Sequence, residues 1–66
     1  LANVSVAEAW AQLKPSERNI LALIAFEGLS VNQVAVTLEI SANTASVRLG
    51  RARKKFAEYL NSGLSD

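Results

Sequence analysis

A long amphipathic helix in the last third of the chain limits the folds that are open to this sequence. Apolar side chains recur there at helical spacing and fall within a sector of about 80°. These side chains are Ala45, Leu49, Ala52, Phe56 and Leu60. The helix spans roughly 30 Å at 1.5 Å per residue, and other helices must cover its apolar seam. The pattern predicts an all-α domain.

Capping and breaking residues divide the rest of the chain into three shorter helices. The segments Ser5-Val-Ala-Glu8 and Ser30-Val-Asn-Gln33 have the pattern of a capping box, in which the two end residues satisfy each other's backbone amides. Pro15 suits the first turn of a second helix, which we expect to run to about Glu27, where Gly28 can take a left-handed conformation. No stretch alternates with a period of two, so we expect four helices and no sheet.

The third and fourth helices are separated by a very short turn. Only Glu39, Ile40 and Ser41 lie between a helix that ends near Leu38 and one that begins at Ala42. We expect Ile40 to be buried and Ser41 to cap the last helix, which is typical of a helix-turn-helix. The sequence predicts a single four-helix domain over residues 1–66, with the helix-turn-helix at about residues 31–60 and a long C-terminal recognition helix. A start at a leucine, in a chain without methionine, indicates a segment of a longer protein.

Apolar residues outside the last helix predict the rest of the core. Val6, Trp10 and Leu13 share one face of the first helix. The second helix is apolar nearly all round, so we expect it to be the most buried element. The large aromatic residues Trp10, Phe26 and Phe56 are expected in the core. A surplus of apolar side chains predicts an exposed patch for a protein partner, formed by Ile24, Val31 and Val36.

The side of the last helix opposite its apolar seam carries small, polar and basic groups. Residues 48–55 hold five of the seven basic side chains and a net charge of +5, whereas residues 1–47 and 56–66 each carry −2. A helix with such a local positive field fits the major groove of DNA. The candidate DNA-binding residues are Asn43, Thr44, Ser46, Val47, Arg48, Gly50, Arg51, Arg53, Lys54 and Lys55.

Three of these residues have specific predicted roles. Arg51, in the middle of the outward face, can bond O6 and N7 of a guanine through its guanidinium fork. Val47 can pack against the methyl group of a thymine. Gly50 costs about 0.5–1 kcal/mol relative to alanine within a helix, which favours a close approach of backbone to DNA over a surface glycine without a role.

The other basic residues of the helix are candidates for phosphate contacts, which add affinity without reading sequence. Arg48 lies near the apolar seam. Its position fits a contact to DNA and an ion pair with Glu17 or Glu27 equally well. The second capping box supplies a further candidate site, because free amides at a helix N-terminus favour a phosphate. Its residues are Ser30, Asn32 and Gln33.

Composition excludes several classes of chemistry. The chain contains no cysteine and no histidine, so thiolate chemistry, an imidazole base and the usual zinc ligands are absent. Its six carboxylates are scattered and form no recognisable acid/base pair. We expect no enzymatic activity, no metal ion and no cofactor. No run of 18 apolar residues occurs, so we also expect no membrane insertion.

The motifs of the chain resemble a known family. The run Thr44-Ala-Ser-Val-Arg-Leu-Gly-Arg-Ala-Arg-Lys-Lys-Phe56 is similar to the signature of region 4, the C-terminal DNA-binding domain of bacterial sigma-70 family factors, and most of all to the extracytoplasmic-function (ECF) type. Upstream, Leu13-Lys-Pro-Ser-Glu-Arg18 and Glu27-Gly-Leu-Ser30 fall where that family has equivalents. The resemblance covers about residues 8–60.

This resemblance implies a function in transcription initiation. The last helix of the chain would recognise the −35 element of double-stranded promoter DNA, and the same domain would engage the β flap of RNA polymerase in the bacterial cytoplasm. An anti-sigma factor is a further implied partner. Two alternatives remain: the output domain of a LuxR-type response regulator, and a helical protein-interaction module that has lost DNA binding.

Overall fold

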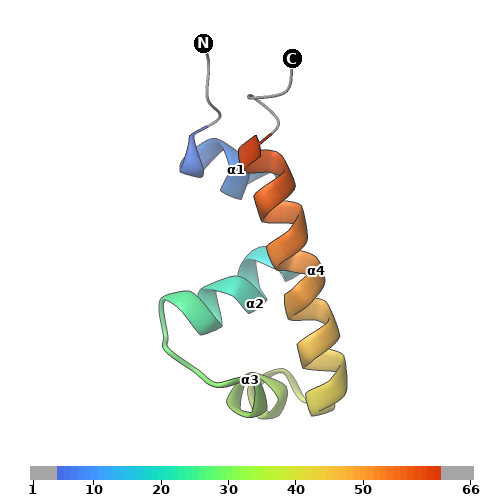
Figure 1. Ribbon diagram of the computed structural model, residues 1–66. Coiled ribbons are helices and arrows are strands. Elements are labelled where there is room, and N and C mark those ends of the chain that lie inside the picture. Colours follow the sequence, from blue (N-terminus) through green and yellow to red (C-terminus); the bar gives the residue numbers. More distant parts are fainter. Residues whose placement is uncertain (1–4, 62–66) are drawn as a thin grey trace.

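Four helices account for most of residues 5–61, the part of the chain that the computed structural model describes (Figure 1). Helix α1 covers Val6–Gln12, α2 covers Pro15–Ala25, α3 covers Val31–Leu38 and α4 covers Ala42–Asn61. No strand occurs among the described residues. The predicted all-α class and the four helices are confirmed.

Both predicted capping boxes are present. The Ser5 hydroxyl accepts a hydrogen bond from the Glu8 amide (3.1 Å), and the Glu8 carboxylate accepts one from the Ser5 amide (2.9 Å). Ser30 and Gln33 make the same pair of bonds at 3.1 and 2.8 Å. Each box satisfies two backbone donors that a helix N-terminus otherwise leaves free. Local sequence therefore fixes where α1 and α3 begin.

Helix α4 is the central element of the domain. It packs against each of the other three helices, which lie along one side of it (Figure 1). Its predicted seam faces them: Ala45, Leu49 and Ala52 are buried, and Phe56 is half-buried against the same core. The other helices and the segment after α1 contribute the remaining buried side chains, which include Leu13, Ile20, Leu21, Val34 and Ala35.

One expectation about α2 was confirmed and one was wrong. Ile20 and Leu21 of this helix are buried and five more of its eleven residues are half-buried, so α2 has the smallest share of exposed residues among the four helices. Phe26 is 76 % exposed and does not belong to the core. The reason is that α2 ends at Ala25, two residues earlier than predicted, and Phe26 caps it at the surface. Gly28 has the expected positive φ, 71°.

The apolar face predicted for α1 is shorter than expected. Trp10 is half-buried and Leu13 is buried, but Val6 is 65 % exposed. The reason is geometric: α1 lies beside the C-terminal end of α4 (Figure 1), and only its second half packs on the core. Its position depends on Trp10, whose ring lies 5.8 Å from the ring of Phe56 in an edge-on arrangement.

The turn between α3 and α4 has a feature that the sequence did not reveal. Glu39 takes the left-handed conformation, with φ 58° and ψ 45°. Its amide and that of Ile40 donate to the last carbonyls of α3, 3.2 Å to Val36 and 2.9 Å to Ala35. Glu39 thus takes the place that a glycine often fills after a helix. Ile40 is half-buried against the core, and the turn directs α4 away from α3.

Candidate nucleic-acid interface

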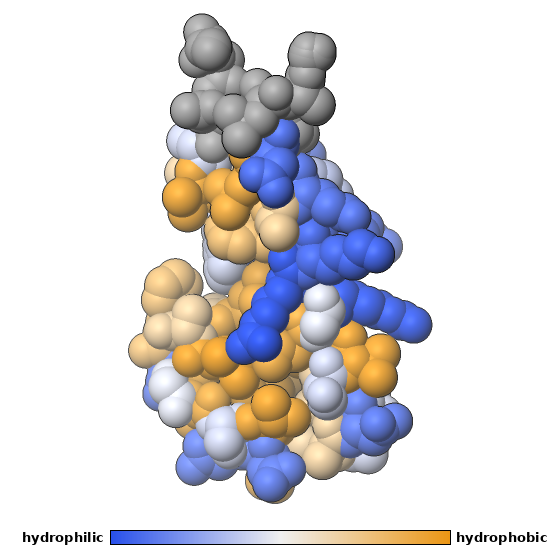
Figure 2. Space-filling model, in the orientation of Figure 1, coloured by the Kyte–Doolittle hydropathy of each residue, from blue (hydrophilic) through white to orange (hydrophobic). Residues whose placement is uncertain are grey.

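Most of the candidate DNA-binding side chains on α4 are accessible. Thr44 and Lys55 are half-buried, and the other eight are exposed. Figure 2 shows hydrophilic side chains standing out along the second half of α4, with apolar surface below and beside them. Arg53 and Arg48 fall on opposite sides of the buried seam, at about 100° per residue. The helix therefore presents cations on both of its flanks.

The N-terminal turn of α4 is held by a cap that includes one of the candidates. The Ser41 hydroxyl accepts from the Thr44 amide (3.0 Å) and donates to the Thr44 hydroxyl (2.8 Å). This confirms Ser41 as the cap. The cap occupies one hydrogen-bonding position of the Thr44 hydroxyl, and leaves Asn43 and Ser46, both exposed, as the polar groups of this turn that face solvent.

Small residues form the middle of the exposed face. Val47 is 45 % exposed, so its methyl groups are accessible to a partner. A β-carbon added to Gly50 would meet no atom within 4 Å, which means that packing inside the domain does not require a glycine there. Because no side chain projects from α4 at Gly50, the backbone of the helix can approach another molecule closely there.

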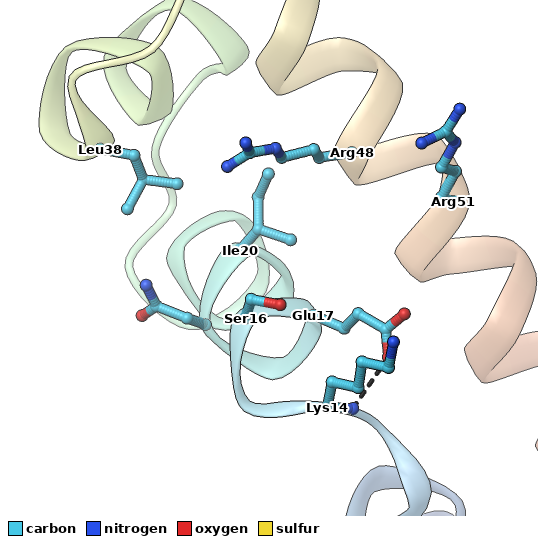
Figure 3. A pocket seen from close by; sticks show the side chains of 8 residues that line it. Lys14, Ser16, Glu17, Ile20, Leu38, Arg48 and Arg51 are labelled. Carbon is cyan, nitrogen blue, oxygen red and sulfur yellow. Dashed lines mark hydrogen bonds between the residues drawn. The ribbon is translucent and has the colours of Figure 1, made fainter.

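Two arginines of α4 border a cavity of about 350 Å³ between α2, α3 and α4. Arg48 extends from α4 across Ile20 toward Leu38 of α3 (Figure 3). Among the described residues Arg48 makes no ion pair, either with Glu17 or with Glu27. Arg51 stands farther along α4 and also borders the cavity, but its side chain points away from Lys14 and Glu17 (Figure 3).

Helix α2 contributes residues to this cavity that sequence reasoning missed. Lys14, Ser16 and Asn19 line it together with Glu17, whose carboxylate accepts a hydrogen bond from the Lys14 amide (2.8 Å). The sequence places these residues in the first turns of a helix. Nothing in their spacing shows that the turns face α4, because that depends on how the two helices pack.

The predicted phosphate site at the start of α3 consists of exposed residues. Ser30 and Gln33 are joined in the capping box, and Asn32 lies between them on the surface. Next to it is a shallow, open hollow lined by Leu29, Val36 and Thr37, in which Val36 is 79 % exposed. Of the predicted apolar patch only Val36 is fully at the surface, since Ile24 and Val31 are half-buried.

The described residues offer no group of three metal-binding side chains. None of the helices formed by residues 5–61 combines the length and apolarity needed to cross a membrane.

Comparison with known families identifies the domain. The model of sigma-70 region 4 matches residues 3–56, most of the chain. Neither a curated protein nor a solved structure gave a match. Four helices, an α3–α4 helix-turn-helix and a basic exposed face on α4 accompany that match. The chain therefore belongs to the region 4 family of sigma-70 factors, a DNA-binding, non-enzymatic family that acts in transcription initiation.

Proposed function

We propose that this domain recognises the −35 element of bacterial promoters, with α4 in the major groove. The observation that carries the proposal is the exposed face of α4, which presents basic side chains on both flanks and small residues between them. A helix in the groove needs this arrangement, because phosphates lie on both sides of it and base edges lie beneath it. The ECF type is part of the proposal and rests on the sequence motifs.

Within this interface the residues divide by role. Arg51 is proposed to bond a guanine and Val47 to contact a thymine methyl group, with Gly50 allowing close approach. Phosphate contacts are assigned to the remaining cations of α4 and to the start of α3. Asn43 and Ser46 are proposed to bond base edges or phosphates beside the groove.

The same domain is proposed to contact the β flap of RNA polymerase in the cytoplasm. Apolar side chains away from the DNA-binding face support a protein contact. Phe26 is 76 % exposed, and its ring lies 5.8 Å from that of Trp10. An anti-sigma factor that covers the domain is proposed as a second protein partner.

The two alternative functions are less well supported. A match to sigma-70 region 4 over residues 3–56 favours the sigma reading over a LuxR-type output domain. A protein-interaction module without DNA binding is favoured only by the exposed Val6, Phe26 and Val36, and it leaves the basic face of α4 without a role.

The test is selection from randomised duplex DNA by the 66-residue domain, followed by sequencing of the bound fraction and fluorescence anisotropy. We expect a short motif with at least one G·C pair. Arg51→Ala is expected to relax the preference at that pair, a loss of about 1–3 kcal/mol of discrimination. Lys54→Ala, which removes a proposed phosphate contact, should weaken binding to all sequences alike and lower the salt slope by about one.

Each outcome decides between the candidate functions. If Arg51→Ala has the same DNA sequence preference as the wild type, Arg51 does not recognise a base. Binding with a steep salt slope and no enriched motif would leave only phosphate contacts. No binding at low salt would contradict the proposal for this domain and leave the protein-interaction module.

A further inference from the structure

We propose that the cavity between α2 and α4 is a phosphate site, in which Lys14 and Arg48 bind one backbone phosphate of the DNA strand beside α4. This inference rests on the proposed function and extends it, because it brings α2 into the interface. It also assigns a role to Lys14, which is not among the DNA-binding residues predicted from the sequence.

The first argument is that cations from α4 and from the segment before α2 border one cavity. Lys14 precedes α2, whereas Arg48 and Arg51 lie one turn apart on α4, and all three border the same cavity of about 350 Å³. In Figure 3 Arg48 reaches over Ile20, and Lys14 and Glu17 lie together at the start of α2. Ser16 and Asn19 add a hydroxyl and an amide that can donate to an oxyanion.

The second argument is the balance of charge. Three positive side chains and one carboxylate, Glu17, line the cavity, so the lining has a net charge of +2. That carboxylate already accepts a hydrogen bond from the Lys14 amide, and neither Arg48 nor Arg51 forms an ion pair with a described residue. The floor of the cavity is apolar, formed by Ile20 and Leu38. An anion there would meet charged donors that have no competing partner.

The third argument concerns which anion reaches the cavity. A helix in the major groove, which is about 12 Å wide, has the phosphates of one strand on each flank. Arg48 lies on the flank of α4 that adjoins α2, and Arg53 lies on the other flank. The strand that passes the α2 side therefore comes close to Lys14. A backbone phosphate is the anion that this placement favours.

The experiment compares the wild-type domain with Lys14→Gln and with Lys54→Gln, which removes the same charge from the outer face of α4. Both changes are at exposed positions, and thermal unfolding verifies that each variant folds. Inorganic phosphate is titrated while the NMR signals of the Arg48 side chain are followed. We expect saturable shifts in the wild type and in Lys54→Gln, and their loss in Lys14→Gln.

A second arm uses the DNA sequence selected above, with single uncharged methylphosphonates placed in turn along each strand. At one position the substitution should weaken wild-type binding more than it weakens binding by Lys14→Gln. For Lys54→Gln the reduced effect of the substitution should fall at a different position. The salt slope of Lys14→Gln should be smaller by about 0.9. Between 50 and 200 mM salt, the affinity advantage of the wild type over this variant then shrinks by about 3.5-fold.

The outcomes separate this proposal from the proposed function. DNA binding in which every methylphosphonate affects the wild type and Lys14→Gln equally overturns the phosphate site and leaves promoter recognition intact. Saturable binding of inorganic phosphate together with that result assigns the cavity to a free anion and contradicts the DNA assignment. Absence of DNA binding by the wild type overturns both proposals.

Discussion

At Gly50, the same substitution is expected to stabilise the fold and to weaken DNA binding. This residue lies inside a helix on an exposed face, with no atom within 4 Å of an added β-carbon. Gly50→Ala should therefore raise the free energy of unfolding by about 0.5–1 kcal/mol. It should also weaken DNA binding, because the added methyl group separates the backbone from the groove. Urea unfolding and fluorescence anisotropy measure the two effects.

Ala57→Gly, the reverse change two turns further along α4, is the matched control. Ala57 is also exposed, so this variant should lose about the same stability without a comparable change in DNA affinity. If Gly50→Ala binds DNA as well as the wild type, the glycine has no part in the interface, and its presence is explained by tolerance at a solvent-exposed position.

The Glu8 carboxylate links the stability of α1 to pH. Hydrogen bonds from the Ser5 amide and then from the Ser5 hydroxyl lower the pKa of Glu8 below its ordinary value of 4.5. A group whose pKa is lower in the folded state stabilises the fold above its unfolded pKa, and this stability is lost as the pH falls through the folded pKa. Glu8→Gln keeps the capping-box geometry but does not titrate.

We therefore expect the wild type to be the more stable protein above about pH 4.5, and its advantage over Glu8→Gln to decrease steadily below that pH. Thermal unfolding of both proteins from pH 7 to pH 3 measures this difference. A constant difference over the whole range would contradict the assignment of the titration to Glu8.

At the scale of the helices, the caps decide where elements begin. The Ser30 hydroxyl accepts from the Gln33 amide (3.1 Å) at the start of α3. Ser30→Ala leaves that amide without its partner and should lower the free energy of unfolding by about 1 kcal/mol. Ser46→Ala is the control, because Ser46 is exposed within α4 and makes no hydrogen bond through its side chain in the described part of the chain. Equal losses in chemical denaturation would show that the capping box contributes nothing specific.

These local signals explain why the helices could be predicted from the sequence. A capping box, a proline or a periodic apolar seam acts within a few residues, so the four helices and the position of the helix-turn-helix follow from short patterns. The end of α2 was placed two residues too late, since an apolar run does not show where a helix stops. The left-handed Glu39 also could not be predicted, because the packing of α3 against α4 imposes that conformation on a residue that rarely adopts it.

At the scale of the whole molecule, the sequence shows which side chains are apolar but not which of them meet. Phe26 and Val6 were expected to be buried, and both are exposed, each at an end of its helix. The cavity between α2 and α4 was likewise not predictable, because Lys14 and Arg48 are far apart in the chain and meet only through packing. The exposed face of α4 was predictable, since it is defined within one helix.

The shape of the domain predicts how it loses structure. It is elongated, 42 × 19 × 16 Å, and α1 lies at one end of α4, away from α3 (Figure 1). Helix α1 is anchored there by Trp10, whose ring contacts those of Phe26 and Phe56. Two aromatic contacts are worth about 1–3 kcal/mol together. An end element with few anchors is expected to open before the rest of a domain.

Trp10→Ala should therefore speed amide hydrogen exchange in α1, by an amount that corresponds to about 1–3 kcal/mol, and leave α2, α3 and the first half of α4 protected. Leu49→Ala removes a buried side chain at the centre of α4, so it should lower protection in all four helices by about 2–5 kcal/mol. Hydrogen exchange followed by NMR distinguishes the two patterns. Since the proposed DNA-binding face depends on α2, α3 and α4, Trp10→Ala should retain DNA binding under conditions in which Leu49→Ala has lost it. Uniform loss of protection in both variants would mean instead that the domain opens as one unit.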